Sequence, residues 1–180
     1  MAKDDFSEHF VSGEEVFAGR LLEVHRDTVR MPDGAQVTRE YIRHPGAVAI
    51  LPLLPDSRVV LERQFRYPLG RDFIEIPAGK IERGEDLLET AKRELLEETG
   101  YVAAEWQRVT TIHNAIGYSD EAIEIYAARG LSLQKQKLDE EEFLEVLELP
   151  LAEALAMVRD GRITDVKTIV ALLWLDTFGK

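Results

Sequence analysis

Apolar and polar residues alternate along the first quarter of the chain, from residue 15 to about residue 42. Such alternation is typical of strands that bury one face. Residues 32–34, Pro-Asp-Gly, interrupt it and favour a tight turn between antiparallel strands. The pattern therefore predicts a strand pair joined at this turn. The first ten or so residues are polar, and we expect them to be disordered.

A continuous apolar run at 47–54, AVAILPLL, comes next and predicts a strand that is buried on both faces. Residues 55–57, Pro-Asp-Ser, favour a turn, so the segment at 58–68 is expected to pair with that strand. Residues 72–79, DFIEIPAG, predict one further short strand. More strands are predicted at 106–114, 121–130 and 142–150.

Helices are predicted by periodicity and end signals at 86–99, at 151–160 and from residue 164 or 165 to about 176. Gly100 stands where the first of these helices needs a C-terminal cap, and Asp165 is a candidate N-cap for the last. The order of strands, one helix, strands and two helices predicts an α+β fold. We expect a mixed β-sheet sandwiched between helices rather than regular βαβ alternation.

The composition of the 180 residues narrows the class of protein. There is no cysteine, which excludes disulfides, thiolate zinc sites and a cysteine nucleophile. The N-terminus has no signal-like apolar run, and no stretch approaches the roughly 20 apolar residues of a membrane span. We therefore expect a cytoplasmic protein without a membrane partner. The formal net charge of -12 argues against nucleic acid as a partner, yet a carboxylate-rich site can bind phosphates through divalent cations.

Glutamates are crowded in one segment, GKIERGEDLLETAKRELLEETGY at 79–101. On a helical wheel at about 100° per residue, three of them fall on one face. These are Glu94, Glu97 and Glu98. Beside them runs an apolar stripe of Leu88, Ala91 and Leu95. Like charges one turn apart repel by a few tenths of a kcal/mol, so a cation such as Arg93 or Mg²⁺ is expected to offset them.

Two interpretations of these glutamates stand side by side. A surface helix with a solvated charged face is the more common cause of such a pattern. The surroundings favour a metal site, because the helix follows a strand that ends in Pro-Ala-Gly at 77–79. Exposed backbone carbonyls of such a segment can lie next to the carboxylates.

The same segment resembles the Nudix box, G-x5-E-x7-R-E-U-x-E-E-x-G-U, where U is a bulky apolar residue. The matching positions are Gly79, Glu85, Arg93, Glu94, Leu95, Glu97, Glu98 and Gly100. Only the last U departs, because Tyr101 is aromatic. The resemblance implies the Nudix fold and a hydrolase that cleaves a nucleoside diphosphate linked to another group. It implies Mg²⁺ as cofactor, or Mn²⁺, with two or more ions in each site.

The resemblance also implies roles for individual residues. The metal ligands would be the Ala78 carbonyl with Glu94, Glu97 and Glu98. Arg93 would orient the glutamates, and Glu85 would be structural, tied to Arg93 or to the loop. A catalytic general base is expected in the later segment KLDEEEFLEV at 137–146. The candidates are Glu140, Glu141 and Glu142, with Asp139 as a further alternative.

Segments outside the box resemble the branch of ADP-ribose and nucleoside-diphosphate-sugar pyrophosphatases, and the resemblance runs from about residue 15 to residue 177. They are HPGAVAILPL, LERQFRYPLG, EIPAGKIE and ITDVKTIVALLWL. It implies an N-terminal strand region at 1–45 that forms a homodimer, and a Nudix domain at 46–180. The expected substrate-binding residues are Arg39, Arg66 and Glu75, since the planar fork of arginine suits phosphate oxygens.

One departure weakens the match to ADP-ribose. The segment NAIGYSDE at 114–121 has Ile116 where many relatives carry proline, so other nucleoside diphosphate sugars gain weight. The alternatives are a catalytically weak module that binds a sugar nucleotide as a regulator, and a hydrolase of other nucleoside diphosphate derivatives. A Nudix-fold isopentenyl isomerase is disfavoured by the lack of cysteine. A hydrolase of oxidised dNTPs fits the flanking segments poorly.

Overall fold

The computed structural model describes residues 6–136 and 143–179, and the chain forms two compact units. The first, called here the N-terminal unit, contains the chain up to Pro45 together with His113–Ala122. The second, the C-terminal unit, contains Gly46–Ile112 and the chain from Ile123 onward. The segment 113–122 therefore belongs structurally with the N-terminal strands although it lies far from them in the sequence.

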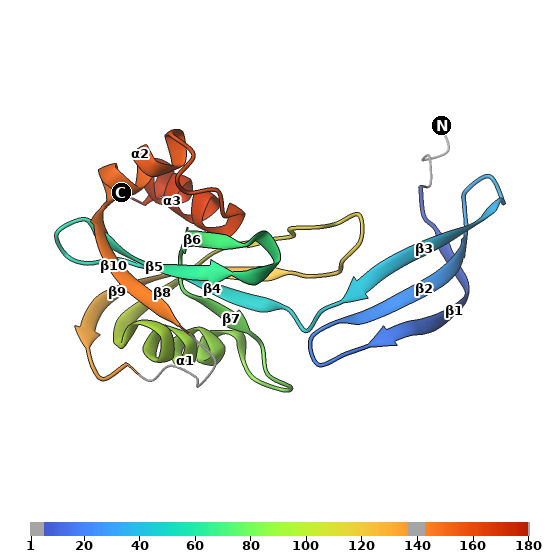
Figure 1. Ribbon diagram of the computed structural model, residues 1–180, viewed down its shortest axis with the longest axis horizontal. Coiled ribbons are helices and arrows are strands. Elements are labelled where there is room, and N and C mark those ends of the chain that lie inside the picture. The colour runs from blue at the N-terminus through green and yellow to red at the C-terminus, as the bar shows by residue number, and fades with distance from the viewer. Residues whose placement is uncertain (1–5, 137–142, 180) are drawn as a thin grey trace. The chain divides into compact units, whose positions relative to one another are not determined.

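The N-terminal unit is built on an antiparallel sheet with the strand order β1-β2-β3 (Figure 1). Its strands are β1 (His9–Ala18), β2 (Glu23–Arg30) and β3 (Gln36–Arg43). The predicted turn between the last two is confirmed: Gly34 has a φ of 90°, and Asp33 Oδ1 accepts a hydrogen bond of 2.9 Å from the N–H of Ala35.

Strand β1 corrects the expectation that the first ten residues are disordered, because it already begins at His9. Its pairing with β2 shifts register twice, between Phe10 and Ser12 and between Glu15 and Phe17. Each shift breaks the period of two along the strand, and all ten residues of β1 are exposed. The alternation that identifies a half-buried strand is therefore absent here.

The C-terminal unit holds a four-stranded sheet in the order β7-β4-β9-β8. Its strands are β4 (Ala47–Pro52), β7 (Ala78–Lys80), β8 (Tyr101–Ile112) and β9 (Ile123–Leu133). Strands β4 and β9 run parallel and the other pairs antiparallel, so the sheet is mixed. All six residues of β4 are buried, as its continuous apolar run predicts.

A second sheet of this unit has the antiparallel order β10-β5-β6. Its strands are β5 (Arg58–Arg66), β6 (Arg71–Glu75) and β10 (Leu144–Pro150), and the short 3-10 helix η1 (Tyr67–Leu69) joins the first two. The predicted pairing of 47–54 with 58–68 is wrong, since the two strands lie in different sheets and share one isolated bridge, Leu53 with Val59. Both edges of β4 are already taken by β7 and β9.

The segment 72–79 forms two strands instead of the single one predicted. Strand β6 ends at Glu75 and β7 begins at Ala78, and the two belong to different sheets. Between them, Pro77 has no N–H for a ladder, and the N–H of Ile76 binds the side chain of Thr168. The chain thus crosses from one sheet to the other at this junction.

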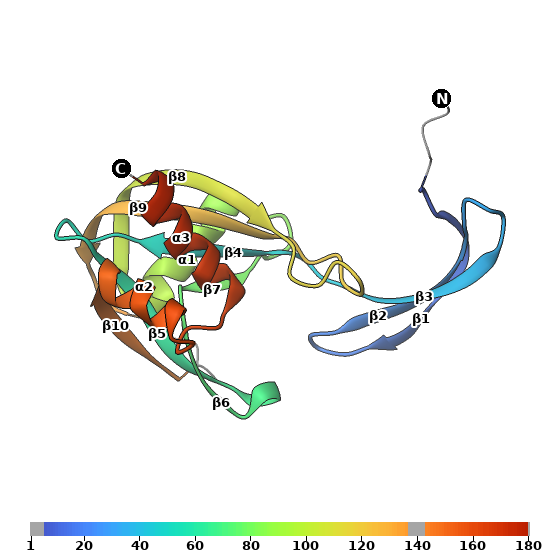
Figure 2. The ribbon, with the colours of Figure 1, turned by 90° about the horizontal axis from the view of Figure 1, so that it is seen from above.

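Three helices cover the sheets of the C-terminal unit, with α1 on one side and α2 and α3 on the other (Figures 1 and 2). They are α1 (Leu87–Thr99), α2 (Leu151–Arg159) and α3 (Val166–Phe178). Asp86 caps the start of α1 and Gly100, with a φ of 75°, follows its end. The predicted α+β class is confirmed. No helix within residues 6–136 and 143–179 is long and apolar enough to cross a bilayer.

Candidate active site

Helix α1 carries its glutamates at the edge of a buried face. Ala91 and Leu95 are completely buried and pack against the four-stranded sheet, as the helical wheel predicts. Glu94 and Glu98 are buried too, with 9% and 3% of their surface exposed. A solvated charged face would leave such residues in water. The two carboxylates are therefore part of an organised polar site.

Arg93 links the glutamates to one another. Its Nη1 donates hydrogen bonds to Glu94 Oε1 at 2.7 Å and to Glu97 Oε2 at 3.1 Å. Its Nε and Nη2 both bind the carboxylate of Glu85, each at 3.0 Å. The hydrogen bonds from Arg93 lower the pKa of Glu85 to about 2, and the hydrogen bond to Glu85 is the main cause that raises the pKa of Arg93. This arginine therefore stays charged and holds three carboxylates in one arrangement.

The junction before β7 lies against the same carboxylates. The backbone N–H of Ala78 donates to Glu98 Oε2 at 2.9 Å. Glu94 lies so close to Gly79 that a Cβ atom on this residue would overlap the carboxylate. Glycine is required here by a close approach of helix to strand. Helix α1 and the junction thus form one continuous site.

A second arginine completes this side of the site. Arg66, the last residue of β5, binds Glu75 through Nε to Oε1 at 2.7 Å and Nη2 to Oε2 at 2.8 Å. Its pKa is raised mainly by this hydrogen-bonded pair, and the charges of Glu62 and Glu98 add to the effect. Burial alone would raise the pKa of Glu75, but hydrogen bonds from Arg66 and the charge of Lys167 outweigh it and lower the pKa.

The donor set suits a hard divalent cation. Mg²⁺ and Mn²⁺ prefer carboxylate and carbonyl oxygens, and two buried carboxylates with a third beside them supply such ligands. The carboxylate of Glu94 occupies the space that a side chain at residue 79 would need. The backbone at Gly79 thus lies directly against an acidic oxygen. The residues of this chain therefore fit the group that the Nudix resemblance implies.

The other predicted site residues lie elsewhere. Arg39 is in the N-terminal unit, where its Nε and Nη2 bind Glu8 at 2.9 and 2.6 Å. The candidates for the general base, Glu140, Glu141, Glu142 and Asp139, lie outside the described residues. Sequence reasoning missed Lys167, which binds the Glu75 carboxylate, and Thr168, whose hydroxyl accepts from the N–H of Ile76. A lysine and a threonine within an apolar helical pattern were the available signal.

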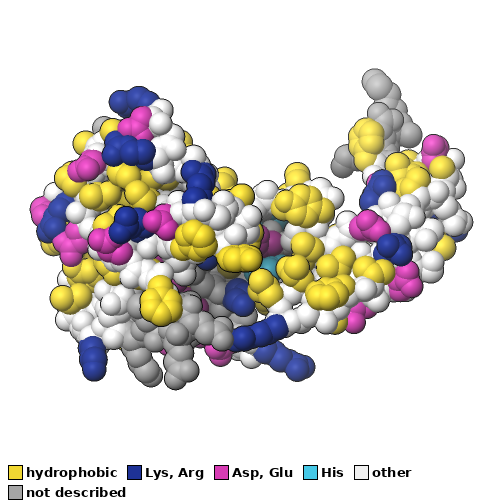
Figure 3. All heavy atoms as spheres, viewed as in Figure 1, with side chains coloured by type: hydrophobic (Ala, Val, Ile, Leu, Met, Phe, Trp, Pro, Cys, Tyr) yellow, Lys and Arg dark blue, Asp and Glu magenta, His cyan; other side chains and the backbone are white. Residues whose placement is uncertain are grey.

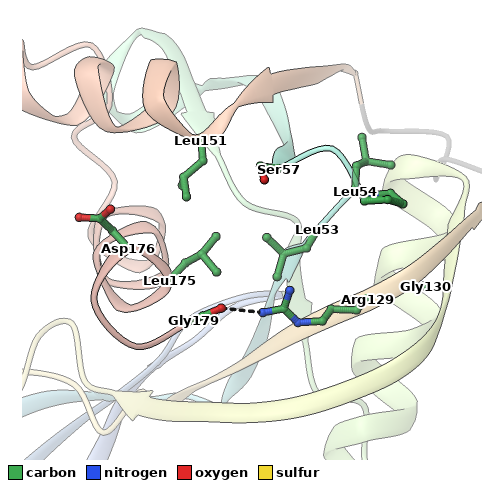
Figure 4. Close-up of a pocket in the computed structure, with 10 residues that line it drawn as sticks. Leu53, Leu54, Ser57, Arg129, Gly130, Leu151, Leu175, Asp176 and Gly179 are labelled. Carbon is green, nitrogen blue, oxygen red and sulfur yellow. Dashed lines mark hydrogen bonds between the residues drawn. The ribbon is translucent and has the colours of Figure 1, made fainter.

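A cavity of about 450 Å³ lies beyond the C-terminal end of β4, where Leu53 and Leu54 follow the strand (Figure 4). Leucine side chains from several elements face it, together with Arg129, which donates a hydrogen bond of 3.3 Å to the carbonyl of Gly179. None of the carboxylates of α1 lines it. The site on α1 is thus identified by its chemistry and not by the size of a hollow.

A site made of acidic oxygens with flanking guanidinium groups suits a metal-dependent enzyme that acts on phosphates. The sequence matches the family model of the NUDIX domain over residues 43–170. That match covers more than half of the chain, and the chain therefore belongs to the Nudix family of hydrolases. Residues 8–42 match a second model, the nucleoside diphosphate sugar hydrolase N-terminal domain.

Individual relatives resemble the chain over nearly its whole length. It is 41% identical over 172 residues to the methanol dehydrogenase activator of Bacillus methanolicus, with 94% of this chain and 93% of that protein covered. It is 39% identical over 170 residues to the ADP-ribose pyrophosphatase of Bacillus subtilis (strain 168), with 93% and 92% covered. The crystal structure of an ADP compounds hydrolase superposes with a TM-score of 0.87 at 25% identity and covers 97% of this chain and 95% of that one. These likenesses confirm the predicted Nudix fold.

Proposed function

We propose that this Nudix hydrolase cleaves the pyrophosphate bond of ADP-ribose or of another nucleoside diphosphate sugar. The products are a nucleoside monophosphate and a sugar phosphate. The observation that carries the proposal is the carboxylate arrangement on α1: Arg93 binds Glu94 and Glu97, and Glu98 on the same helix accepts a hydrogen bond from Ala78 next to the β6–β7 junction. The similarity to an ADP-ribose pyrophosphatase supports this class of substrate.

Different residues of the site would bind the metal ions, orient the carboxylates and bind the phosphate. The ligands for Mg²⁺ or Mn²⁺, two or more ions in a site, would be the Ala78 carbonyl with Glu94, Glu97 and Glu98. When bound, such ions neutralise pyrophosphate oxygens and lower the pKa of a water. Arg93 holds the carboxylates of Glu94 and Glu97 in position by hydrogen bonds. Arg66 binds a phosphate oxygen through N–H groups beyond the two that Glu75 takes.

The proton of the attacking water needs an acceptor. We assign this role to one of Glu140, Glu141 and Glu142, with Asp139 as the alternative, because an acidic loop residue can serve as a general base. Replacing each by its amide separately and measuring the pH dependence of kcat identifies the one that matters.

The N-terminal region, residues 1–45, is proposed to form a homodimer, with residues 46–180 as the Nudix domain. Hydrophobic side chains gather over the strands of the N-terminal sheet (Figure 3). Phe10 and Phe17 on β1 are 68% and 55% exposed. Such apolar surface on a thin sheet is typical of an interface. Arg39, in the same unit, is proposed to reach a substrate phosphate.

The test is a substrate panel with purified protein. ADP-ribose and the ADP-, UDP- and GDP-sugars are incubated with Mg²⁺ or Mn²⁺, and phosphate is released from the products by a coupled phosphatase. We expect metal-dependent release from one or more of them, and none with EDTA. Binding of a sugar nucleotide without any product would favour the regulatory module instead.

A second function is favoured by one observation, the 41% identity to a methanol dehydrogenase activator. The chain would then raise the rate of a dehydrogenase. The test compares the rate of purified methanol dehydrogenase without the chain, with the wild type and with Glu98→Gln. An effect that Glu98→Gln retains would separate this function from hydrolysis.

A further inference from the structure

Two neighbouring polar residues are buried at the start of α3. Lys167 is 7% exposed and Thr168 is fully buried. Burying an ammonium or a hydroxyl costs free energy unless other groups pair with it. The groups that pair with Lys167 and Thr168 therefore indicate which parts of the fold these two side chains connect. Both side chains reach the β6–β7 junction, 92 positions earlier in the sequence.

Lys167 binds the same carboxylate that Arg66 binds. Its Nζ forms an ion pair with Glu75 Oε2, while Arg66 donates hydrogen bonds to both oxygens of the same carboxylate. The Glu75 side chain is 4% exposed, whereas that of Arg66 is 41% exposed. The carboxylate is thus fixed between a buried cation and one that opens toward solvent.

The start of α3 is itself held firmly. The carboxylate of Asp165 accepts from the N–H of Thr168 at 3.0 Å and from its hydroxyl at 2.6 Å, and it lies 3.1 Å from Lys167 Nζ. The Thr168 hydroxyl also accepts a hydrogen bond of 2.8 Å from the N–H of Ile76. The ammonium of Lys167 therefore projects from a helix terminus that is anchored to the junction.

The orientation of Arg66 follows from these contacts. A guanidinium carries five N–H donors in a rigid plane, and Arg66 gives one Nε–H and one Nη2–H to Glu75. The remaining donors lie on other edges of the plane, which is the geometry in which arginine binds a phosphate. The direction of those edges depends on where the Glu75 carboxylate is held.

We propose that Lys167 is a positioning residue for phosphate binding: it anchors Glu75 to α3, and Glu75 in turn holds the guanidinium of Arg66 in its orientation. The role rests on the proposed function, since it concerns the phosphate of that substrate. It assigns a task to a residue that does not touch the substrate and that stands on a different helix from the carboxylates.

A double-mutant cycle tests whether Lys167 acts through Arg66. The variants are Lys167→Met, Arg66→Gln and the two combined, with Lys135→Met as control, because Lys135 is an exposed lysine of the same unit. We expect kcat/KM to fall about tenfold in Lys167→Met, since misplacing a binding group lowers the rate. The combined variant is expected to be no slower than Arg66→Gln alone, because the positioned group is already gone. Losses that multiply would overturn the proposal.

A second measurement is independent of turnover. In ¹⁵N NMR spectra, the Nε–H signal of Arg66 is assigned by its absence in Arg66→Gln. We expect Lys167→Met to shift or broaden this signal and Lys135→Met to leave it in place. Glu75→Gln, which keeps the side-chain shape, should move it too and serves as a second variant if Lys167→Met does not fold.

The two measurements separate the possible failures. An Arg66 signal that is unchanged in both Lys167→Met and Glu75→Gln overturns the positioning role, whatever the turnover. A wild-type protein that hydrolyses none of the nucleoside diphosphate sugars overturns the proposed function, and the NMR signal then decides the positioning by itself.

Discussion

The carboxylate of Glu98 on α1 accepts a hydrogen bond of 2.9 Å from the backbone N–H of Ala78 at the start of β7. This bond joins the helix to the point where the chain crosses between the two sheets. Pro77, the residue before Ala78, has no N–H of its own, and its carbonyl accepts a hydrogen bond of 2.8 Å from the N–H of Ile50 on β4. A helix residue and a strand residue 20 positions apart are thereby held in one site.

Replacing Glu98 by glutamine is expected to lower metal-dependent turnover by about a hundredfold or more, because an amide is a weaker ligand for a hard cation than a carboxylate. The amide oxygen can still accept from Ala78, so the fold should persist. Turnover and Mn²⁺ binding by calorimetry are measured together. Glu89→Gln is the control, since Glu89 stands on the same helix with its side chain 63% exposed. Full activity of Glu98→Gln would contradict the assigned role.

Gly79→Ala is expected to destabilise the protein by about 1–3 kcal/mol, the usual cost of forcing extra volume into a packed site. The added methyl group would overlap the Glu94 carboxylate, so helix and strand have to separate. Chemical denaturation measures the free energy of unfolding. Gly117→Ala is the control, because no atom lies within 4 Å of the place of its Cβ. Equal stability of the two variants would show that the close approach does not constrain residue 79.

Local periodicity explains how much of the site could be predicted from the sequence. The spacing of Glu94, Glu98, Ala91 and Leu95 fixes which side chains share a face of α1, because the helix repeat is the same in every protein. Asp86 and Gly100 mark the ends of that helix through cap chemistry that is equally local. The helix was accordingly predicted at 86–99 with Gly100 as its C-terminal cap, and the structure differs only in making Asp86 the N-cap instead of the first helical residue.

Contacts between distant segments could not be predicted in this way. The turn between β4 and β5 suits a hairpin, but β4 takes its partners from β7 and β9 instead. Partner choice depends on how whole sheets pack, and residue patterns within one strand do not record it. The ion pair of Glu75 with Lys167 is hidden for the same reason, since the two residues are 92 positions apart.

The pairing of Glu85 with Arg93 predicts a pH dependence of stability. The pKa of Glu85 is lowered from 4.5 to about 2 in the folded chain, mainly by hydrogen bonds from Arg93. The folded state therefore favours the ionised form. The resulting stabilisation is fully present above about pH 4.5 and is lost as the pH falls toward 2.

Glu85→Gln should remove this contribution. We expect its thermal midpoint to lie below that of the wild type at pH 7, and the gap to narrow as the pH falls from 4.5 toward 2. Glu82→Gln, at an exposed position in the same loop, is the control. A gap that stays constant over this range would show that the pair contributes no pH-dependent stability.

The exposed aromatic residues of β1 predict a change in oligomeric state. Phe10 and Phe17 are 68% and 55% exposed in the single chain, and burial of a large aromatic side chain contributes about 1.5–3 kcal/mol. Removing both should therefore dissociate the proposed homodimer. We expect the double variant Phe10→Ser, Phe17→Ser to elute with the mass of one chain in light scattering, while the wild type elutes with twice that mass. Phe178→Ser is the matched control, because Phe178 is 70% exposed at the end of α3, outside the N-terminal unit. A wild type that has the mass of one chain, or a double variant that keeps the mass of two, would rule out this surface as the interface.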